Sequence, residues 1–162
     1  MSCNNPKGSV WGKWDLHVHT PCSIVQNYGG NNDMSWNGFI ADLEKLPPEL
    51  KVIGVNDYLF FDGYERLLKV KREQGRLKNL DLILPVVELR LDPFAGLLVK
   101  DKYGRYLSSD WNRINLHIVF DQLEPEILRK QFLATLGECY DLIPDSKDFA
   151  ERWQTPIARD SV

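Results

Sequence analysis

Segments with strand spacing alternate with segments with helical spacing along most of this 162-residue chain. Apolar side chains recur at helical intervals in residues 36–46 and again in 127–136. Short runs rich in apolar residues, at 51–55 and 82–91, have the length of strands instead. An alternation of this kind predicts an α/β fold in which helices cover a mostly parallel sheet.

The predicted strands cover residues 14–18, 51–55, 82–91 and 113–120. The connection at 97–110 is polar around Lys102 and is expected to form an excursion or a hairpin. Four βα units amount to about half of a (β/α) barrel, which typically takes ~250 residues. The chain is therefore expected to be the N-terminal portion of a larger barrel.

Residues at the predicted helix ends follow known capping preferences. Ser35 is expected to cap the first helix and Asp62 the second, which Gly75 would terminate. Pro125 stands where the first turn of a third helix tolerates proline. These signals place helices after the first, second and fourth predicted strands.

Composition narrows the classes of function. Hydrophobic residues make up 43% of the chain and charged residues 27%, which excludes disorder as a description of the whole. The net charge of −3 argues against a protein whose main function is binding nucleic acid, because such proteins usually carry an excess of basic residues. No apolar run reaches the ~18 residues of a membrane span. The three cysteines are an odd number at scattered positions, which favours free thiols over a set of disulfides. The expected location is the cytoplasm, without membrane contact.

The most specific motif is Asp-Leu-His-Val-His-Thr at residues 15–20. Alternate side chains of a strand share a face, so Asp15, His17 and His19 are expected to project together. Two imidazoles beside a carboxylate suit a divalent metal: the histidines would bind it, and Asp15 would orient one ring or brace the following loop. The alternative is a pair of ordinary polar positions near a loop. The chain has three histidines and places two of them here, which favours the metal site.

Three further candidates lie at or near the ends of other predicted strands, where barrel active sites assemble. Glu88 is a carboxylate inside an apolar strand, which is costly unless it binds a metal or forms an ion pair, for example with Arg90. His117 is either a ligand or a hydrogen-bonded core histidine. Asp57 is either catalytic or a turn and helix-capping residue.

Taken in order, these motifs resemble those of PHP domains, the family named for polymerases and histidinol phosphatases. Residues 15–20, followed by Ser23, resemble the first PHP motif, and Val87-Glu88 and Leu116-His117 resemble the later glutamate and histidine motifs. The resemblance extends over residues 14–121. The second motif corresponds to Asn56-Asp57-Tyr58. Together with Trp11-Gly12-Lys13-Trp14 before the first motif, it is similar to the TrlF-like branch, in which a PHP domain opens a longer protein ending in an ATPase, with some members associated with phage defence.

The resemblance implies a PHP-type distorted (β/α)7 barrel that holds two or three Mn, Zn or Fe ions. His17 and His19 would bind one metal, Glu88 would bridge two, and His117 would bind the second. Asp15, Asp57 and Glu88 would be the catalytic residues. Sites of this family hydrolyse phosphate esters through a metal-activated hydroxide.

The chain also departs from the family pattern. Tyr58 stands where the second motif usually has a histidine, and no histidine follows His117 to supply the later motifs. Two explanations compete: a truncated chain, or a degenerate domain. The expected organisation is a lead-in at 1–13, an incomplete PHP-like domain at 14–140, and the start of the remainder at 141–162.

The favoured hypothesis is a metal-dependent phosphoesterase, the nuclease or phosphatase part of a larger ATPase-linked protein. Its substrate would be a phosphate ester or a nucleic acid, and its partner an ATPase domain or a second copy. The alternative is a degenerate, non-catalytic PHP module with a structural or interaction role. A third is a metal-dependent amide or amine hydrolase, because related barrels share the HxH opening. A basic stretch forms either a solvated face or a guide for a nucleic-acid backbone: Lys69, Lys71, Arg72, Arg76 and Lys78.

Overall fold

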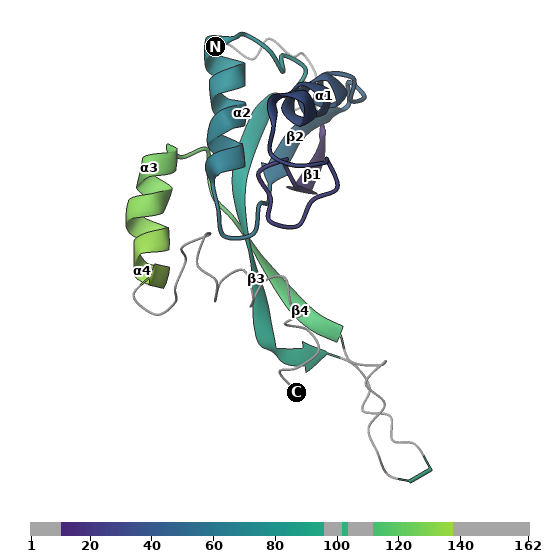
Figure 1. The fold of residues 1–162 in the computed structure, drawn as a ribbon, viewed down its shortest axis with the longest axis vertical. Coiled ribbons are helices and arrows are strands. Elements are labelled where there is room, and N and C mark those ends of the chain that lie inside the picture. Colours follow the sequence, from purple (N-terminus) through teal and green to yellow (C-terminus); the bar gives the residue numbers. More distant parts are fainter. Residues whose placement is uncertain (1–10, 96–101, 104–111, 138–162) are drawn as a thin grey trace.

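The computed structural model describes residues 11–95, 102–103 and 112–137. Within them, four strands form one curled half-barrel sheet in the order β1-β2-β3-β4 (Figure 1). The strands are β1 (Lys13–Val18), β2 (Leu50–Val55), β3 (Leu82–Ala95) and β4 (Asn112–Val119). The predicted α/β class is therefore confirmed. Most of the lead-in predicted at 1–13 and all of the stretch at 141–162 lie outside the described residues.

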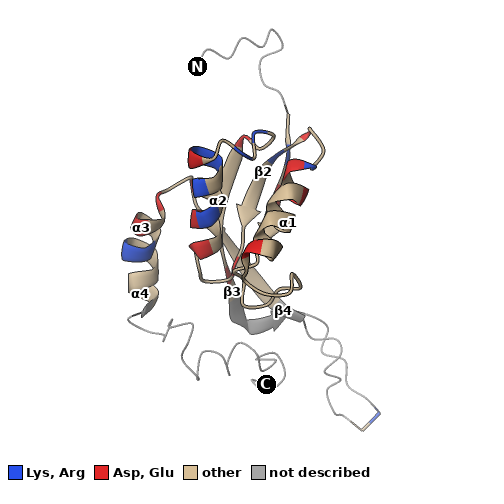
Figure 2. Ribbon diagram, turned by 45° about the horizontal axis from the view of Figure 1, so that its top comes forward, with Lys and Arg blue, Asp and Glu red and all other residues tan. Residues whose placement is uncertain are grey.

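Three helices accompany the sheet in the described part of the chain. They are α1 (Asp33–Glu44), α2 (Asp62–Glu73), and one helix made of α3 (Pro125–Ile127), the π-helical η2 (Leu128–Leu133) and α4 (Ala134–Gly137). Figure 2 shows α1 and α2 side by side over the sheet, with the third helix beyond α2. None of these helices is long and apolar enough to cross a membrane.

The pairing of the strands corrects the expected run of four βα units. β1, β2 and β3 are parallel, but β4 runs antiparallel to β3. Parallel strands need a crossover, usually helical, whereas antiparallel neighbours can be joined by a hairpin. The connection between β3 and β4 has a turn at Lys102 and Tyr103, in line with the hairpin alternative. A complete (β/α)7 barrel is not shown.

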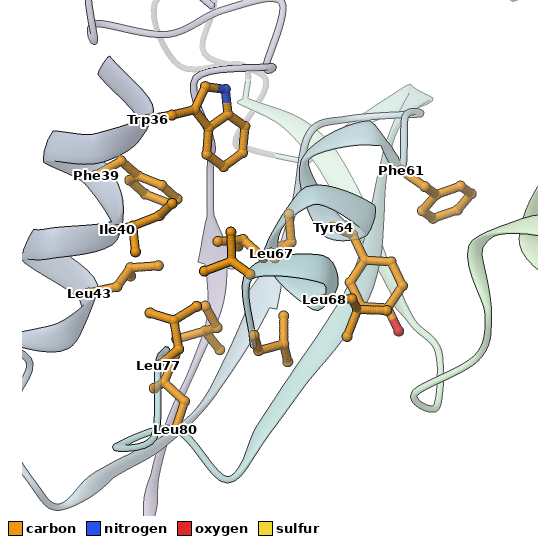
Figure 3. Packing of buried hydrophobic residues seen from close by; sticks show 14 of the residues in the cluster. Trp36, Phe39, Ile40, Leu43, Phe61, Tyr64, Leu67, Leu68, Leu77 and Leu80 are labelled. Atoms are coloured by element: carbon orange, nitrogen blue, oxygen red, sulfur yellow. The ribbon is translucent and has the colours of Figure 1, made fainter. Parts of the chain in front are cut away.

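The core lies between the sheet and the helices α1 and α2. Trp36, at the start of α1, is fully buried and donates its indole N–H to Asn31 Oδ1 at 2.7 Å. Tyr64 and Leu67 of α2 are also fully buried, and Tyr64 points away from α1 (Figure 3), where its hydroxyl donates to the Leu123 carbonyl at 2.8 Å. β2 is hydrogen-bonded to β1 on one side and to β3 on the other, and its residues Ile53 and Val55 belong to this core, which fixes the carboxyl ends of β1 and β2.

Local signals at the helix ends were predicted with mixed success. Asn32, not Ser35, caps α1: its side chain accepts a hydrogen bond from the Ser35 backbone N–H at 3.0 Å. Phe61 occupies the N-cap position of α2 without a side-chain cap, and Asp62 instead accepts from Arg129 at 3.1 Å. Gly75, just past the end of α2, has the positive φ (64°) expected of a helix terminator.

The basic stretch on and after α2 is engaged within the domain. Lys69 pairs with Glu65, Arg72 with Glu124, and Arg76 with Glu44, while Lys71 donates to the Leu77 carbonyl; all four contacts are 3.0 Å or shorter. Figure 2 shows basic and acidic residues interspersed along α2. This arrangement fits the solvated-face interpretation, in which such pairs contribute about 0–1 kcal/mol each.

Candidate metal centre

Three strands bring the candidate residues to one place. His17 is on β1 and His19 follows it, at the carboxyl end of the strand. Glu88 lies on β3, three positions past Pro85, which is the last residue of β3 paired with β2. His117 is the direct cross-strand partner of Glu88 in the antiparallel ladder of β3 and β4. The hairpin therefore carries the carboxylate and the third histidine to the ends of the parallel strands.

The three imidazoles gather beside the Glu88 carboxylate. His17 Nε2 lies 3.4 Å from Glu88 Oε2 and 3.2 Å from His19 Nε2, and His117 Nε2 lies 3.7 Å from the same Glu88 oxygen. The rings of His17 and His117 meet edge to face, with centroids 4.7 Å apart. His17 and His117 thus converge on one carboxylate oxygen, and His19 joins them through its contact with His17.

The cluster of His17, His19 and Glu88 could hold a metal ion, because their ligand atoms lie within 4.8 Å of one another. A tetrahedral ion with bonds of about 2.0–2.1 Å would separate two ligand nitrogens by roughly 3.3 Å. The observed separations of 3.2 and 3.4 Å match that value closely. The donor set of imidazole nitrogen and carboxylate oxygen is one that zinc, manganese and iron accept.

Glu88 is buried, with 4% of its surface exposed, and each of its oxygens has a hydrogen-bond donor. Asn56 Nδ2 donates to Oε2 at 2.9 Å, and Asn115 Nδ2 donates to Oε1 at 2.6 Å. These amides offset the cost of burying a carboxylate without cancelling its charge. The side chain of Arg90, the alternative ion-pair partner, lies outside the described part of the structure.

His19 is held from two sides. Its Nδ1 lies 3.3 Å from Ser23 Oγ, and its ring packs on that of Tyr58 with centroids 5.0 Å apart. Burial, together with the neighbouring imidazole of His17, lowers the pKa of His19 below its usual value. A lowered pKa favours the neutral ring at physiological pH, which is the form that binds metals.

Asp57 is not part of the cluster. Its carboxylate is fully buried and accepts hydrogen bonds from the Thr20 backbone N–H at 2.8 Å and the Thr20 hydroxyl at 2.6 Å. A Cβ on Gly63, in the first turn of α2, would lie 2.0 Å from Asp57 Oδ2, so glycine is required there. Burial raises the pKa of Asp57 to about 6. The residue fastens the loop after β1 to the loop after β2, and it does not cap α2.

Asp15 also lies apart from the ligand atoms that the described residues bring together. It is exposed on β1, and its Oδ1 accepts a hydrogen bond from the backbone N–H of His17 at 3.1 Å. The contact is therefore to the main chain of the motif rather than to an imidazole ring. This geometry supports bracing of the strand end and gives no evidence for orientation of a ring.

Tyr58 occupies the position at which the second motif was expected to provide a histidine. Its φ is +61°, an unusual conformation for a residue other than glycine, and its carbonyl accepts the Glu88 backbone N–H at 3.0 Å. Strain of this kind costs on the order of 1 kcal/mol or more and is found often at functional sites. Tyr58 thus links the end of β2 to the strand segment that carries Glu88.

Two asparagines that contact Glu88 were not predicted as site residues. Asn56 belongs to the motif Asn56-Asp57-Tyr58, in which Asp57 was the predicted site residue and Tyr58 the departure from the family pattern. Asn115 has the same strand parity as His117, and this parity was the available signal. Asn56 Oδ1 is also the single buried side-chain oxygen or nitrogen in the described residues that has no hydrogen-bond partner.

Comparison of the chain with models of known protein families, with curated proteins and with solved structures finds no match.

Proposed function

We propose that this chain carries a PHP-type, metal-dependent phosphoesterase site. The observation that supports this most directly is the convergence of His17, His19, Glu88 and His117, which come from three strands, within 3.2–3.7 Å contacts. Their order along the chain is also that of the PHP motifs. The proposal rests on both observations together, the contacts among these four residues and the order of the motifs along the chain.

The residues present fit a divalent ion of the Mn, Zn or Fe group. His17, His19 and Glu88 would hold one ion, and His117, which approaches the same Glu88 oxygen beside His17, would contribute to a second, so that Glu88 would be shared by the two. A divalent ion supplies Lewis acidity toward phosphoryl oxygens and lowers the pKa of a bound water. The number of ions, two or three in a complete site, belongs to the proposal.

The residues of the chain would contribute in distinct ways. His17 is half-exposed, with 49% of its side chain accessible, which leaves one side of the cluster open to an anionic ester. His19, with its lowered pKa, offers a neutral nitrogen. Glu88 provides negative charge from a buried position. A phosphate ester is therefore the substrate class proposed, as either a phosphatase or a nuclease.

The test is elemental analysis of the chain purified without chelators, compared with the His17→Ala, His19→Ala double variant. We expect bound metal in the wild type and its loss in the double variant. Hydrolysis of 4-nitrophenyl phosphate and bis(4-nitrophenyl) phosphate with added Mn²⁺ or Zn²⁺ should then separate phosphatase from diesterase activity. Absence of metal from the wild type, even after incubation with either ion, would overturn the proposal.

The alternative is a degenerate PHP module that is structural or interacts with a partner such as an ATPase domain. The observation favouring it is Tyr58, whose ring packs against His19 where a further ligand was expected. This alternative predicts metal binding without turnover of either ester, or no metal at all. The basic side chains of α2 pair with carboxylates and carbonyls of the same domain, so they add no support for a nucleic-acid partner.

A further inference from the structure

The two amides that reach Glu88 come from separate parts of the sheet. Asn56 follows β2 and lies 32 positions before Glu88, whereas Asn115 is on β4, diagonally across the ladder. Each donates one N–H to a different carboxylate oxygen. A carboxylate oxygen can accept more than one hydrogen bond or ligand, so both oxygens keep accepting capacity after this pairing. Oε2, held by Asn56, is the oxygen that faces His17 and His117.

The chemistry of these donors differs from that of an ion pair. An amide satisfies a buried oxygen but carries no charge, whereas a lysine or arginine would neutralise the carboxylate and compete with a cation. Two donors on the two oxygens also fix the rotation of the carboxylate plane. The pair therefore orients Glu88 and leaves its charge available to an ion.

Asn56 has a second property that points to a ligand. The Nδ2 of Asn56 donates to Glu88, which identifies the other atom of the amide as the oxygen Oδ1. This Oδ1 is buried and has no hydrogen-bond partner among the described residues. Buried polar atoms in native proteins nearly always have partners. A water that enters the site together with a cation would supply the hydrogen-bond donor that this oxygen lacks.

We propose that Asn115 and Asn56 are positioning residues that hold the Glu88 carboxylate in the orientation in which it binds a divalent cation. This inference rests on the proposed metal-dependent function and extends it to residues that do not themselves bind the ion. Outer-shell partners of metal ligands commonly contribute 10–100-fold to metal affinity.

The experiment is isothermal titration of the metal-free chain with Zn²⁺, using Asn115→Ala as the main variant. Asn115 is exposed, so its replacement should leave the fold intact. We expect the Kd for Zn²⁺ to rise roughly 10–100-fold, with an unchanged melting temperature in chelator. Asn115→Gln, which keeps the amide donor, should recover part of the lost affinity. Asn37→Ala, an exposed asparagine on α1, is the matched control and should bind as the wild type does.

Asn56→Ala should weaken Zn²⁺ binding at least as much, because it leaves the buried Oε2 without its donor. Its melting temperature in chelator shows whether it folds, and the conclusion rests on Asn115→Ala if it does not. Unchanged Zn²⁺ affinity in Asn115→Ala would overturn the positioning role while leaving the metal site in place. Absence of Zn²⁺ binding by the wild type would instead overturn the proposed function, and the positioning role with it.

Discussion

The site region holds two buried carboxylates, Asp57 in the loop that follows β2 and Glu88 on β3, and their surroundings differ. Asp57 is enclosed: both of its oxygens accept from Thr20, and Gly63 closes the remaining space. Glu88 is equally buried, yet its amide donors leave one oxygen facing two imidazoles. Burial alone therefore does not identify a functional carboxylate. Each carboxylate accepts one hydrogen bond per oxygen, so the two differ in what else faces them: Thr20 and Gly63 at Asp57, and two imidazoles at Glu88.

The largest effect should come from closing the space around Asp57. Gly63→Ala places a Cβ 2.0 Å from Asp57 Oδ2 and 2.2 Å from Thr20 Oγ1, so the buried pair must separate. We expect a loss of about 3 kcal/mol or more in the free energy of unfolding, measured by urea denaturation. The matched control is Gly38→Ala on α1, where nothing lies within 4 Å of the added Cβ. That variant should gain up to about 1 kcal/mol, and equal behaviour of the two would contradict the role assigned to Gly63.

A substitution of the second carboxylate, Glu88, should change the affinity for a metal rather than the stability of the fold. Glu88→Gln removes the charge that the imidazoles and the amides surround. Zn²⁺ affinity should fall by more than about 100-fold, beyond the effect typical of outer-shell partners. Glu65→Gln, on a carboxylate paired with Arg129, is the control and should leave Zn²⁺ affinity unchanged. Tight Zn²⁺ binding by Glu88→Gln would remove the contrast between Glu88 and Asp57.

Asp57 should contribute a dependence of stability on pH. Burial raises its pKa from 3.8 to about 6, so between these values the folded chain still holds a proton that the unfolded chain has released. Through Asp57, rising pH lowers the free energy of unfolding across that window, by roughly 2–3 kcal/mol. The lowered pKa of His19 acts in the opposite direction, so the contribution of Asp57 is the difference between the wild type and Asp57→Asn. Asp57→Asn should lack this decline. The measurement is urea denaturation of both proteins in chelator from about pH 4 to 7, and parallel curves would contradict the prediction.

The smallest effect is expected at Ser23, which contacts the far side of His19. Its hydroxyl lies 3.3 Å from Nδ1, a long distance for a hydrogen bond of this kind. Ser23→Ala should cost about 0.5–1 kcal/mol in Zn²⁺ binding, or roughly a two- to fivefold rise in Kd. A larger loss than that of Asn115→Ala would show that the orientation of His19, rather than that of Glu88, limits the affinity.

Much of the local structure could be predicted because it depends on neighbouring residues. The alternation of Asp15, His17 and His19 follows from the period of a strand, and the apolar spacing of residues 36–46 follows from that of a helix. Capping was less predictable, because Asn32 and Ser35 are both suitable residues and the backbone path of the preceding loop selects between them. The direction of β4 was left open by the choice between an excursion and a hairpin, since an apolar strand carries the same pattern in a parallel and an antiparallel ladder.

The sequence by itself determined which residue types can bind a metal and on which face of each strand they lie. It left open which of them meet, because a contact between distant segments depends on strand register and direction. The antiparallel register of β3 and β4 set His117 opposite Glu88 and Asn115 within reach of its carboxylate. Thr20, from the loop after β1, holds the Asp57 carboxylate next to Gly63 of α2, and Asp57 stays outside the cluster of His17, His19 and Glu88. The tertiary structure thus gave Asp57 and Glu88 different partners, because those partners come from segments that are distant in the sequence.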